Sequence, residues 1–217
     1  KEQLWGYREN EPMGGYDPYS SSKGAAEIAI ASWRRSFFNP EQYEKHGKSI
    51  ASVRAGNVIG GGDWALDRII PDCIRALESN KPIEIRNPKA IRPWQHVLEP
   101  LSGYMLLASK MWDEPTKYCE GWNFGPRAES ITSVWKVATK VIENYNNRGE
   151  LRDISDPDAL HEARLLMLDI SKAKFLLGWE PRMNINQCVA LTIDWYKGYK
   201  QNSIYELCLN EISTFLV

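Results

Sequence analysis

Short apolar segments alternate with longer helical segments along much of this 217-residue chain. Residues 49–54, 83–86 and 121–124 are short and rich in apolar side chains, as buried strands are. Helical patterns follow them at residues 67–79, 97–112 and 131–145. Such an alternation is typical of α/β proteins with parallel strands. The sequence therefore predicts an α/β fold.

The remaining segments add further helices. Residues 18–37 favour a helix, with a core-facing stripe of Ala26, Ile30, Trp33 and Phe37 at helical spacing. A loop is expected at 39–48. A short strand at 165–168 precedes a helix at 171–177 that ends at Gly178, and a final long helix spans 185–200, with an extension at 204–215.

Tyr19 and Lys23 stand near the start of the first predicted helix. Pro18 suits the first helical position and Asp17 is a candidate N-cap. A spacing of four places the phenol and the ammonium on one face of the helix. A neighbouring cation favours phenolate, so such a pair can exchange a proton with an alcohol that is being oxidised. The alternative is an ordinary helix with a surface Tyr and Lys.

The surroundings of this pair resemble the active-site helix of the extended short-chain dehydrogenase/reductases, which act on nucleotide sugars. The resemblance covers YDPYSSSKGAA at 16–26 and four later motifs in the family's order: RAGNV at 54–58, RPWQHV at 92–97, WNFGP at 122–126 and DISKAK at 169–174. Within this family, YRENEPMGG at 7–15, SFFNP at 36–40 and VIGGGDW at 58–64 look like the CDP-glucose 4,6-dehydratase group.

The resemblance implies the C-terminal portion of a Rossmann-type doubly wound parallel sheet, with a smaller mixed α/β substrate-binding domain. Residues 1–60 would belong to the NAD-binding Rossmann domain. Residues 61–217 would mainly form the sugar-nucleotide domain, with segments near 96–125 returning to the Rossmann domain. The Gly-rich NAD-binding turn and further acid-base residues would lie before Lys1, so the 217-residue chain alone is expected to be inactive.

The resemblance also implies a reaction. NAD oxidises C4 of CDP-glucose, water leaves across C5–C6, and hydride returns to C6. Tyr19 would remove the proton of the 4-hydroxyl, while Lys23 favours the phenolate and holds the nicotinamide ribose. Alternatives are an epimerase or decarboxylase of the same family, or a non-catalytic domain that binds a sugar nucleotide.

Further site residues follow from the resemblance. Asn57 would face both the nicotinamide and the substrate phosphates, or else satisfy a turn. Arg92 would grip the diphosphate, because a guanidinium offers paired donors; the alternative is a solvated loop arginine. Arg68 and Ile85 align with weaker substrate contacts. Near the C-terminal substrate loop, His161 or Arg164 would complete nucleotide recognition.

Two aromatic residues and one glycine-rich run leave alternatives open. Trp64 and Trp94 could stack on a pyrimidine or simply be packed. Residues 60–65 satisfy the Gly-x-Gly-x-x-Ala form of a dinucleotide fingerprint. The strand before this run ends too early for a tight turn, and Asp63 would repel a pyrophosphate. The sequence therefore favours a flexible loop beside a substrate.

Composition excludes other classes. The chain has 43% hydrophobic and 25% charged residues and a net charge of −1, without the basic block of a nucleic-acid surface. No apolar run reaches the ~20 residues of a membrane span. The scattered cysteines (Cys73, Cys119, Cys188 and Cys208) and histidines (His46, His96 and His161) predict neither a disulfide frame nor a metal site. A cytoplasmic homo-oligomer, dimeric or tetrameric, is expected.

Overall fold

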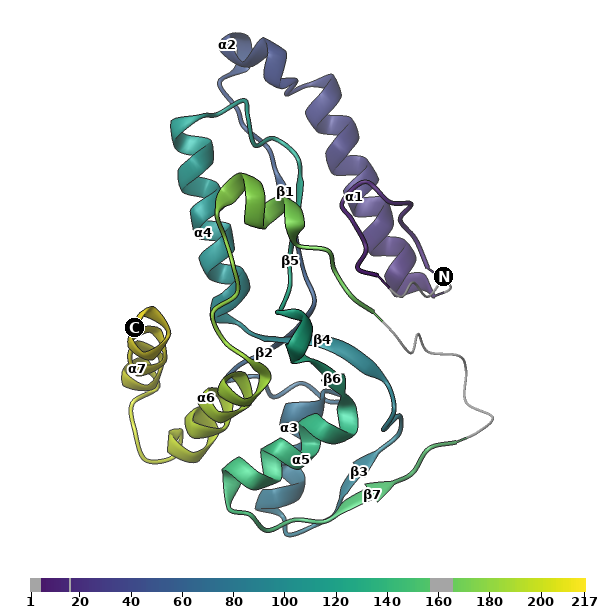
Figure 1. Cartoon of the computed structure of the whole chain (residues 1–217), viewed down its shortest axis with the longest axis vertical. Coiled ribbons are helices and arrows are strands. Elements are labelled where there is room, and N and C mark those ends of the chain that lie inside the picture. Colours follow the sequence, from purple (N-terminus) through teal and green to yellow (C-terminus); the bar gives the residue numbers. More distant parts are fainter. Residues whose placement is uncertain (1–4, 16, 157–165) are drawn as a thin grey trace.

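The strands form three small sheets in a computed structural model that describes residues 5–15, 17–156 and 166–217 (Figure 1). Strand β1 (Ser52–Ala55) pairs in parallel with β5 (Gly121–Phe124). Strand β4 (Ile91–His96) pairs in parallel with β2 (Asn57–Ile59) and antiparallel with β6 (Ile131–Ser133). Strand β3 (Ile83–Ile85) pairs in parallel with β7 (Leu151–Asp153). The predicted α/β class is confirmed.

Each predicted helix is present, with shifts of a few residues at the ends. The α-helices are α1 (Pro18–Ser36), α2 (Tyr43–His46), α3 (Ile69–Glu78), α4 (Leu98–Asp113), α5 (Val134–Tyr145), α6 (Ile185–Gly198) and α7 (Ile204–Leu216). Short 3-10 turns occupy Pro40–Gln42 and Ala128–Ser130, and a π-helical turn occupies Ala173–Leu177. Gly178 ends that turn with a φ of 73°, as the stop signal predicted.

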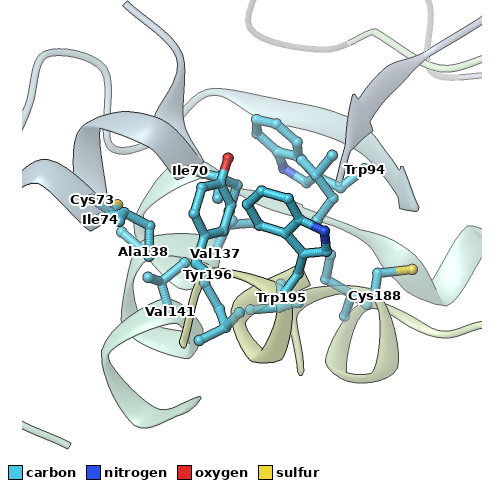
Figure 2. Close-up of a cluster of buried hydrophobic side chains, with 14 of the residues drawn as sticks. Ile70, Cys73, Ile74, Trp94, Val137, Ala138, Val141, Cys188, Trp195 and Tyr196 are labelled. Carbon is cyan, nitrogen blue, oxygen red and sulfur yellow. The ribbon is translucent and has the colours of Figure 1, made fainter. Parts of the chain in front are cut away.

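Two hydrophobic cores hold these elements together. The larger core joins α3, α5 and α6 to strands β2, β3 and β4 (Figure 2). Its helices are amphipathic: Ile70, Ile74 and Leu77 follow helical spacing along α3 and are buried. The smaller core lies between α4, β5 and the segment around Ala173–Trp179, with Trp122 and Phe124 at its centre. Figure 1 shows the corresponding division, with α1, α4, β1 and β5 in the upper half and α3, α5, β3 and β7 in the lower half.

The sequence missed strands β2, β4, β6 and β7. Residues 131–133 were expected in a helix, but Ser133 is the N-cap of α5 and its hydroxyl accepts a hydrogen bond from Lys136 N at 3.3 Å. The residues before it are therefore free to pair with β4. Strand β4 contains Pro93, which argues against a strand interior because proline lacks an N–H. The parallel pairing with β2 begins only at Trp94, so Pro93 costs that ladder no bond.

Three smaller expectations are corrected. The loop expected at 39–48 contains Pro40–Gln42 and α2, because Asn39 caps the first turn by accepting from Glu41 N at 3.0 Å. Of the strand expected at 165–168, residue 165 lies outside the described residues and the rest makes a single bridge, from Leu168 to Tyr7. A turn at residues 199–203 separates α7 from α6, so α7 is a separate helix.

The core-facing stripe expected on α1 is wrong. Trp33 and Phe37 are 58% and 64% exposed, and Gly24 is the buried residue of the helix. The helix instead meets the rest of the chain through small and polar groups. Gly24 lies against the backbone of Met13 and Gly14, and Glu27 bonds to side chains of β1.

Candidate active site

The first turn of α1 is fixed by the predicted cap. Asp17 Oδ1 accepts from Ser20 N at 2.9 Å, and Oδ2 accepts from Ser20 Oγ at 2.6 Å. The side-chain bond, followed by the backbone bond, lowers the pKa of Asp17 below its ordinary value, so the carboxylate stays charged at the helix N-terminus. This cap sets the direction in which the first turn presents Tyr19.

Tyr19 and Lys23 lie one turn apart on α1, as the spacing predicted. The Lys23 ammonium is 5.5 Å from the centroid of the Tyr19 ring, and Tyr19 is 71% exposed. Tyr19 lines a large pocket, and Lys23 is not one of the described residues that line it. The first turns of α1 therefore place the Tyr19 phenol at the pocket and the Lys23 ammonium next to the Tyr19 ring.

That pocket has a volume of about 1020 Å³ and lies where β2, β3, β4 and α3 meet the start of α1. It brings together most of the predicted site residues, which come from separate parts of the chain: Tyr19, Asn57, Arg68, Ile85 and Arg92. His161 and Arg164 lie outside the described residues. A volume of this order matches the upper range of ligand-sized sites, about 300–1,000 Å³.

Two neighbouring strands, β2 and β4, contribute residues to the lining of the pocket. Asn57 opens β2 and pairs with Trp94 of β4, two residues from Arg92. Arg92 is only 9% exposed, and its Nη1 donates to Ile91 O at 3.0 Å. The alternative of a solvated loop arginine is therefore wrong, since Arg92 is a buried strand residue. Trp94 is 5% exposed, lines the pocket and donates through Nε1 to Thr132 O at 3.2 Å.

Two arginine–aspartate pairs also line the pocket: one lies within the loop of residues 60–68, and the other joins Arg86 to that loop. Arg68 Nη1 lies 3.1 Å from Asp63 Oδ2, and Arg86 Nη2 lies 2.8 Å from Asp67 Oδ1. All four residues line the pocket. Arg86 and the two aspartates were not predicted as site residues, although Arg86 directly follows Ile85 and Asp63 lies in the loop expected beside a substrate.

A partly buried ion pair attaches α1 to β1. Arg54 Nη2 of β1 lies 2.9 Å from Glu27 Oε2 of α1, and Ser52 Oγ donates to the same oxygen at 2.8 Å. Glu27 lies one turn beyond Lys23. Burial alone would raise the pKa of Glu27, but the bonds from Arg54 and Ser52 outweigh it and hold the pKa below its ordinary value.

The glycine-rich run follows β2 directly, so the expectation that the preceding strand ends too early is wrong, but the run is still not a tight strand-to-helix turn. Residues 60–68 separate the end of β2 from the start of α3, whereas a dinucleotide cradle needs a tight turn into the helix N-terminus. The run is also packed, because a Cβ on Gly61 would come within 2.2 Å of the Trp195 ring. It lines the pocket at Gly60 and Asp63, but its packing against Trp195 contradicts the expected flexible loop.

The described part of the chain contains neither a candidate metal site nor a candidate membrane-spanning helix. No group of three or more His, Cys, Asp or Glu side chains there could hold a metal ion. None of the described helices combines the length and apolar composition needed to span a bilayer.

Comparison with known proteins gives a family match over most of the chain. The sequence profile of the family described as GDP-mannose 4,6 dehydratase matches residues 2–192. A CDP-glucose 4,6-dehydratase of Salmonella typhimurium is 49% identical over all of this chain, which covers 60% of that relative. A bovine dTDP-D-glucose 4,6-dehydratase is 24% identical over 88% of this chain and 50% of the relative. The chain thus spans three-fifths or less of the length of these relatives.

Solved structures show the same fold. A dTDP-glucose 4,6-dehydratase from Bacillus anthracis, crystallised with NAD, matches with a TM-score of 0.75 at 19% identity, over 92% of this chain and 58% of that one. A UDP-glucuronic acid 4-epimerase from Bacillus cereus, in complex with UDP-glucuronic acid and NAD, matches with a TM-score of 0.74 at 18% identity, over 92% and 58%. The Rossmann-type α/β fold expected from the sequence is confirmed.

Proposed function

The chain belongs to the GDP-mannose 4,6 dehydratase family, and on that premise we propose that its protein is an NAD-dependent CDP-glucose 4,6-dehydratase. The observation that most directly supports the proposal is that Tyr19 of α1 and Arg92 of β4 line the same pocket. A proton acceptor and a phosphate-binding cation are two of the groups that such a reaction on a nucleotide sugar needs in one cavity. The 49% identity to the Salmonella relative supports CDP-glucose as the substrate.

The roles of the chain's own residues follow from their chemistry. Tyr19 would accept the proton of the sugar 4-hydroxyl, and Lys23 would favour the phenolate that does so. Arg92, buried beside the pocket, would bind the diphosphate through paired charge-assisted hydrogen bonds, with Arg68 as a second cation in the lining of the pocket. Ile85 would give the substrate an apolar contact. His161 is proposed as a further nucleotide contact.

The residues present fit the nicotinamide end of a bound NAD. The Tyr19 hydroxyl and the Lys23 ammonium are donors that suit ribose hydroxyls, and Asn57 lines the same pocket as Tyr19. When bound, NAD would take a hydride from C4 of the sugar and return it to C6. Tyr19 then has to hold or release one proton at its phenol oxygen, which is the task that its position in the pocket supports.

We propose the expected division into domains with one change. The β1–β5 pair and α4 share the smaller core, which supports assigning residues 1–60 and 96–125 to the Rossmann part. The segment around Ala173–Trp179 packs in this core too, so we add it to that part. The rest of 61–217 surrounds the larger core and would bind the sugar nucleotide. A homo-oligomer stays a prediction.

One incubation tests the function. Full-length protein is mixed with CDP-glucose and NAD, and the products are followed by mass and by NADH absorbance. We expect a 4-keto-6-deoxy sugar and no net NADH, because the hydride is returned within each turnover. Net NADH would favour a simple dehydrogenase, an epimeric sugar of unchanged mass would favour an epimerase, and unchanged sugar would favour a binding domain. dTDP-glucose serves as the matched substrate control.

A further inference from the structure

Tyr196 of α6 reaches from the larger core to the wall of the pocket. The side chain is 1% exposed, and its hydroxyl donates a 2.5 Å hydrogen bond to the backbone carbonyl of Asp63. Figure 2 shows the Tyr196 ring beside Trp195, with the hydroxyl pointing away from α6. The bond joins two positions that are 133 residues apart in the sequence. One end of it belongs to the core, and the other end lines the pocket.

The aromatic residues of α6 also shape the loop on either side of Asp63. Gly61 lies so close to Trp195 that only a residue without a Cβ fits, and Gly62 has a φ of 80°, which favours glycine. The Trp64 ring packs edge-on against Tyr196, with centroids 5.1 Å apart. The loop is therefore held by contacts on both sides of the hydrogen bond from Tyr196.

The side chain of Asp63 connects the anchored loop to an arginine of the pocket, Arg68. Its Oδ1 accepts from Ala65 N at 3.0 Å, which fixes the side chain against the loop. Its Oδ2 accepts from Arg68 Nη1 at 3.1 Å, and both residues line the pocket. Without the carboxylate in this position, the Arg68 side chain, 64% exposed, would have many rotamers open to it.

We propose that Tyr196 is a positioning residue for sugar-nucleotide binding, which acts through Asp63 to hold Arg68 at the pocket. The inference rests on the proposed function for the identity of the ligand. Arg68 provides the cation, Asp63 orients it, and Tyr196 fixes the backbone of Asp63 relative to the rigid core. A preorganised arginine loses less conformational entropy when an anion binds, so the expected benefit is in affinity.

The hydrogen bond is present at any pH at which the enzyme would work. Burial, together with the nearby Asp63 charge, raises the pKa of Tyr196 to about 12. The phenol therefore remains a donor at neutral pH. Its role is structural support and differs from that of Tyr19, whose phenol is exposed to the pocket.

The test compares Tyr196→Phe with wild type in the full-length protein. The substitution keeps the ring and its packing and removes only the donor. We expect the affinity for CDP-glucose, measured by calorimetry, to fall about threefold to tenfold, the effect of one ordinary hydrogen bond. KM should rise by a similar factor, while kcat and NAD affinity stay within about twofold, because Arg68 orients the substrate and takes no part in proton transfer.

Two comparisons separate positioning from general stability. Tyr199→Phe is the matched control, since this tyrosine is the C-cap of α6 and its hydroxyl donates to Glu78 Oε1 at 3.2 Å; the affinity of this variant for CDP-glucose should equal that of wild type. In an Arg68→Ala background, Tyr196→Phe should have less than about twofold further effect, because its route to the ligand is already broken. Amide hydrogen exchange of residues 60–68 should be faster in Tyr196→Phe than in Tyr199→Phe.

The outcomes are distinguishable. Unchanged affinity and unchanged loop exchange in Tyr196→Phe, in a protein that turns over CDP-glucose, would overturn this inference alone. Fully additive effects of Tyr196→Phe and Arg68→Ala would overturn the route through Arg68. A wild-type protein that neither binds nor converts CDP-glucose would overturn the proposed function and this role with it, while the exchange data would still report whether Tyr196 anchors the loop.

Discussion

The Lys23 ammonium lies 5.5 Å from the centroid of the Tyr19 ring, one turn along α1. At this distance a cation is attracted by the electrons of the ring face. Lys23 thus lies next to the ring, while the phenol of Tyr19 lines the pocket. The pair therefore places a phenol at the pocket and a cation against the ring of the same tyrosine.

We expect Tyr19→Phe in the full-length protein to fold normally, to bind CDP-glucose and to lose most of its turnover. The side chain is exposed, so removing its hydroxyl changes little packing, whereas proton transfer of this kind contributes about 10²- to 10⁴-fold. Steady-state assays check kcat, and calorimetry checks binding. Tyr205→Phe, at an exposed tyrosine of α7, is the control. A wild-type rate in Tyr19→Phe would remove Tyr19 from the mechanism.

Arg92→Lys should weaken CDP-glucose binding roughly tenfold to more than a hundredfold, because charge-assisted hydrogen bonds are worth about 1.5–3 kcal/mol each. Lysine keeps the charge but cannot offer the paired donors of a guanidinium. NAD affinity should hardly change. Arg148→Lys, at an exposed loop position, is the matched control for calorimetry. Equal damage to both ligands would mean that the buried side chain supports the fold rather than the diphosphate.

Glu27→Gln should reduce stability at neutral pH, and the difference from wild type should shrink in acid. The bonds from Arg54 and Ser52 hold the folded pKa below the ordinary 4.5, so the carboxylate contributes stability above that value and loses it as the pH falls through the folded pKa. Thermal midpoints at about pH 7 and about pH 3 measure this. Glu44→Gln, at an exposed carboxylate of α2, should show no such pH dependence.

Glu99→Leu should destabilise the protein strongly. Glu99 of α4 is 1% exposed and accepts hydrogen bonds from Arg182 N at 2.8 Å and Met183 N at 2.6 Å. A leucine would leave these two donors without an acceptor, at about 1–3 kcal/mol for each buried donor. Urea unfolding measures the loss. Glu114→Leu, which removes a surface ion pair with Lys117, should change the midpoint far less.

The 217-residue chain alone should not bind NAD tightly. Its glycine-rich run is followed by α3 only after residue 68, and Gly61 is packed against Trp195, so neither the turn nor the space for a pyrophosphate is there. Calorimetric titration with NAD checks this. Micromolar affinity would contradict it and would return residues 60–65 to the role of a phosphate cradle.

Short-range signals in the sequence were enough for the α-helices other than α2 and for the Tyr19–Lys23 part of the site. Asp17 and Pro18 fix where α1 begins, and a spacing of four fixes that Tyr19 and Lys23 share a face, because both depend only on neighbours within one or two turns. The same holds for Gly178, whose left-handed backbone ends a helical turn. The order of the motifs identified the family, and the family resemblance in turn identified several of the residues that line the pocket.

The tertiary structure alone decided what depends on contacts between distant residues. Strand β4 exists because β2 and β6 pair with it on either side, although Pro93 argues locally against a strand. Arg92 is buried for the same reason, and Trp33 and Phe37 are exposed because Gly24 and Glu27 make the contacts of α1. Tyr196 bonds to a loop 133 residues away, a distance over which helical periodicity and capping carry no information.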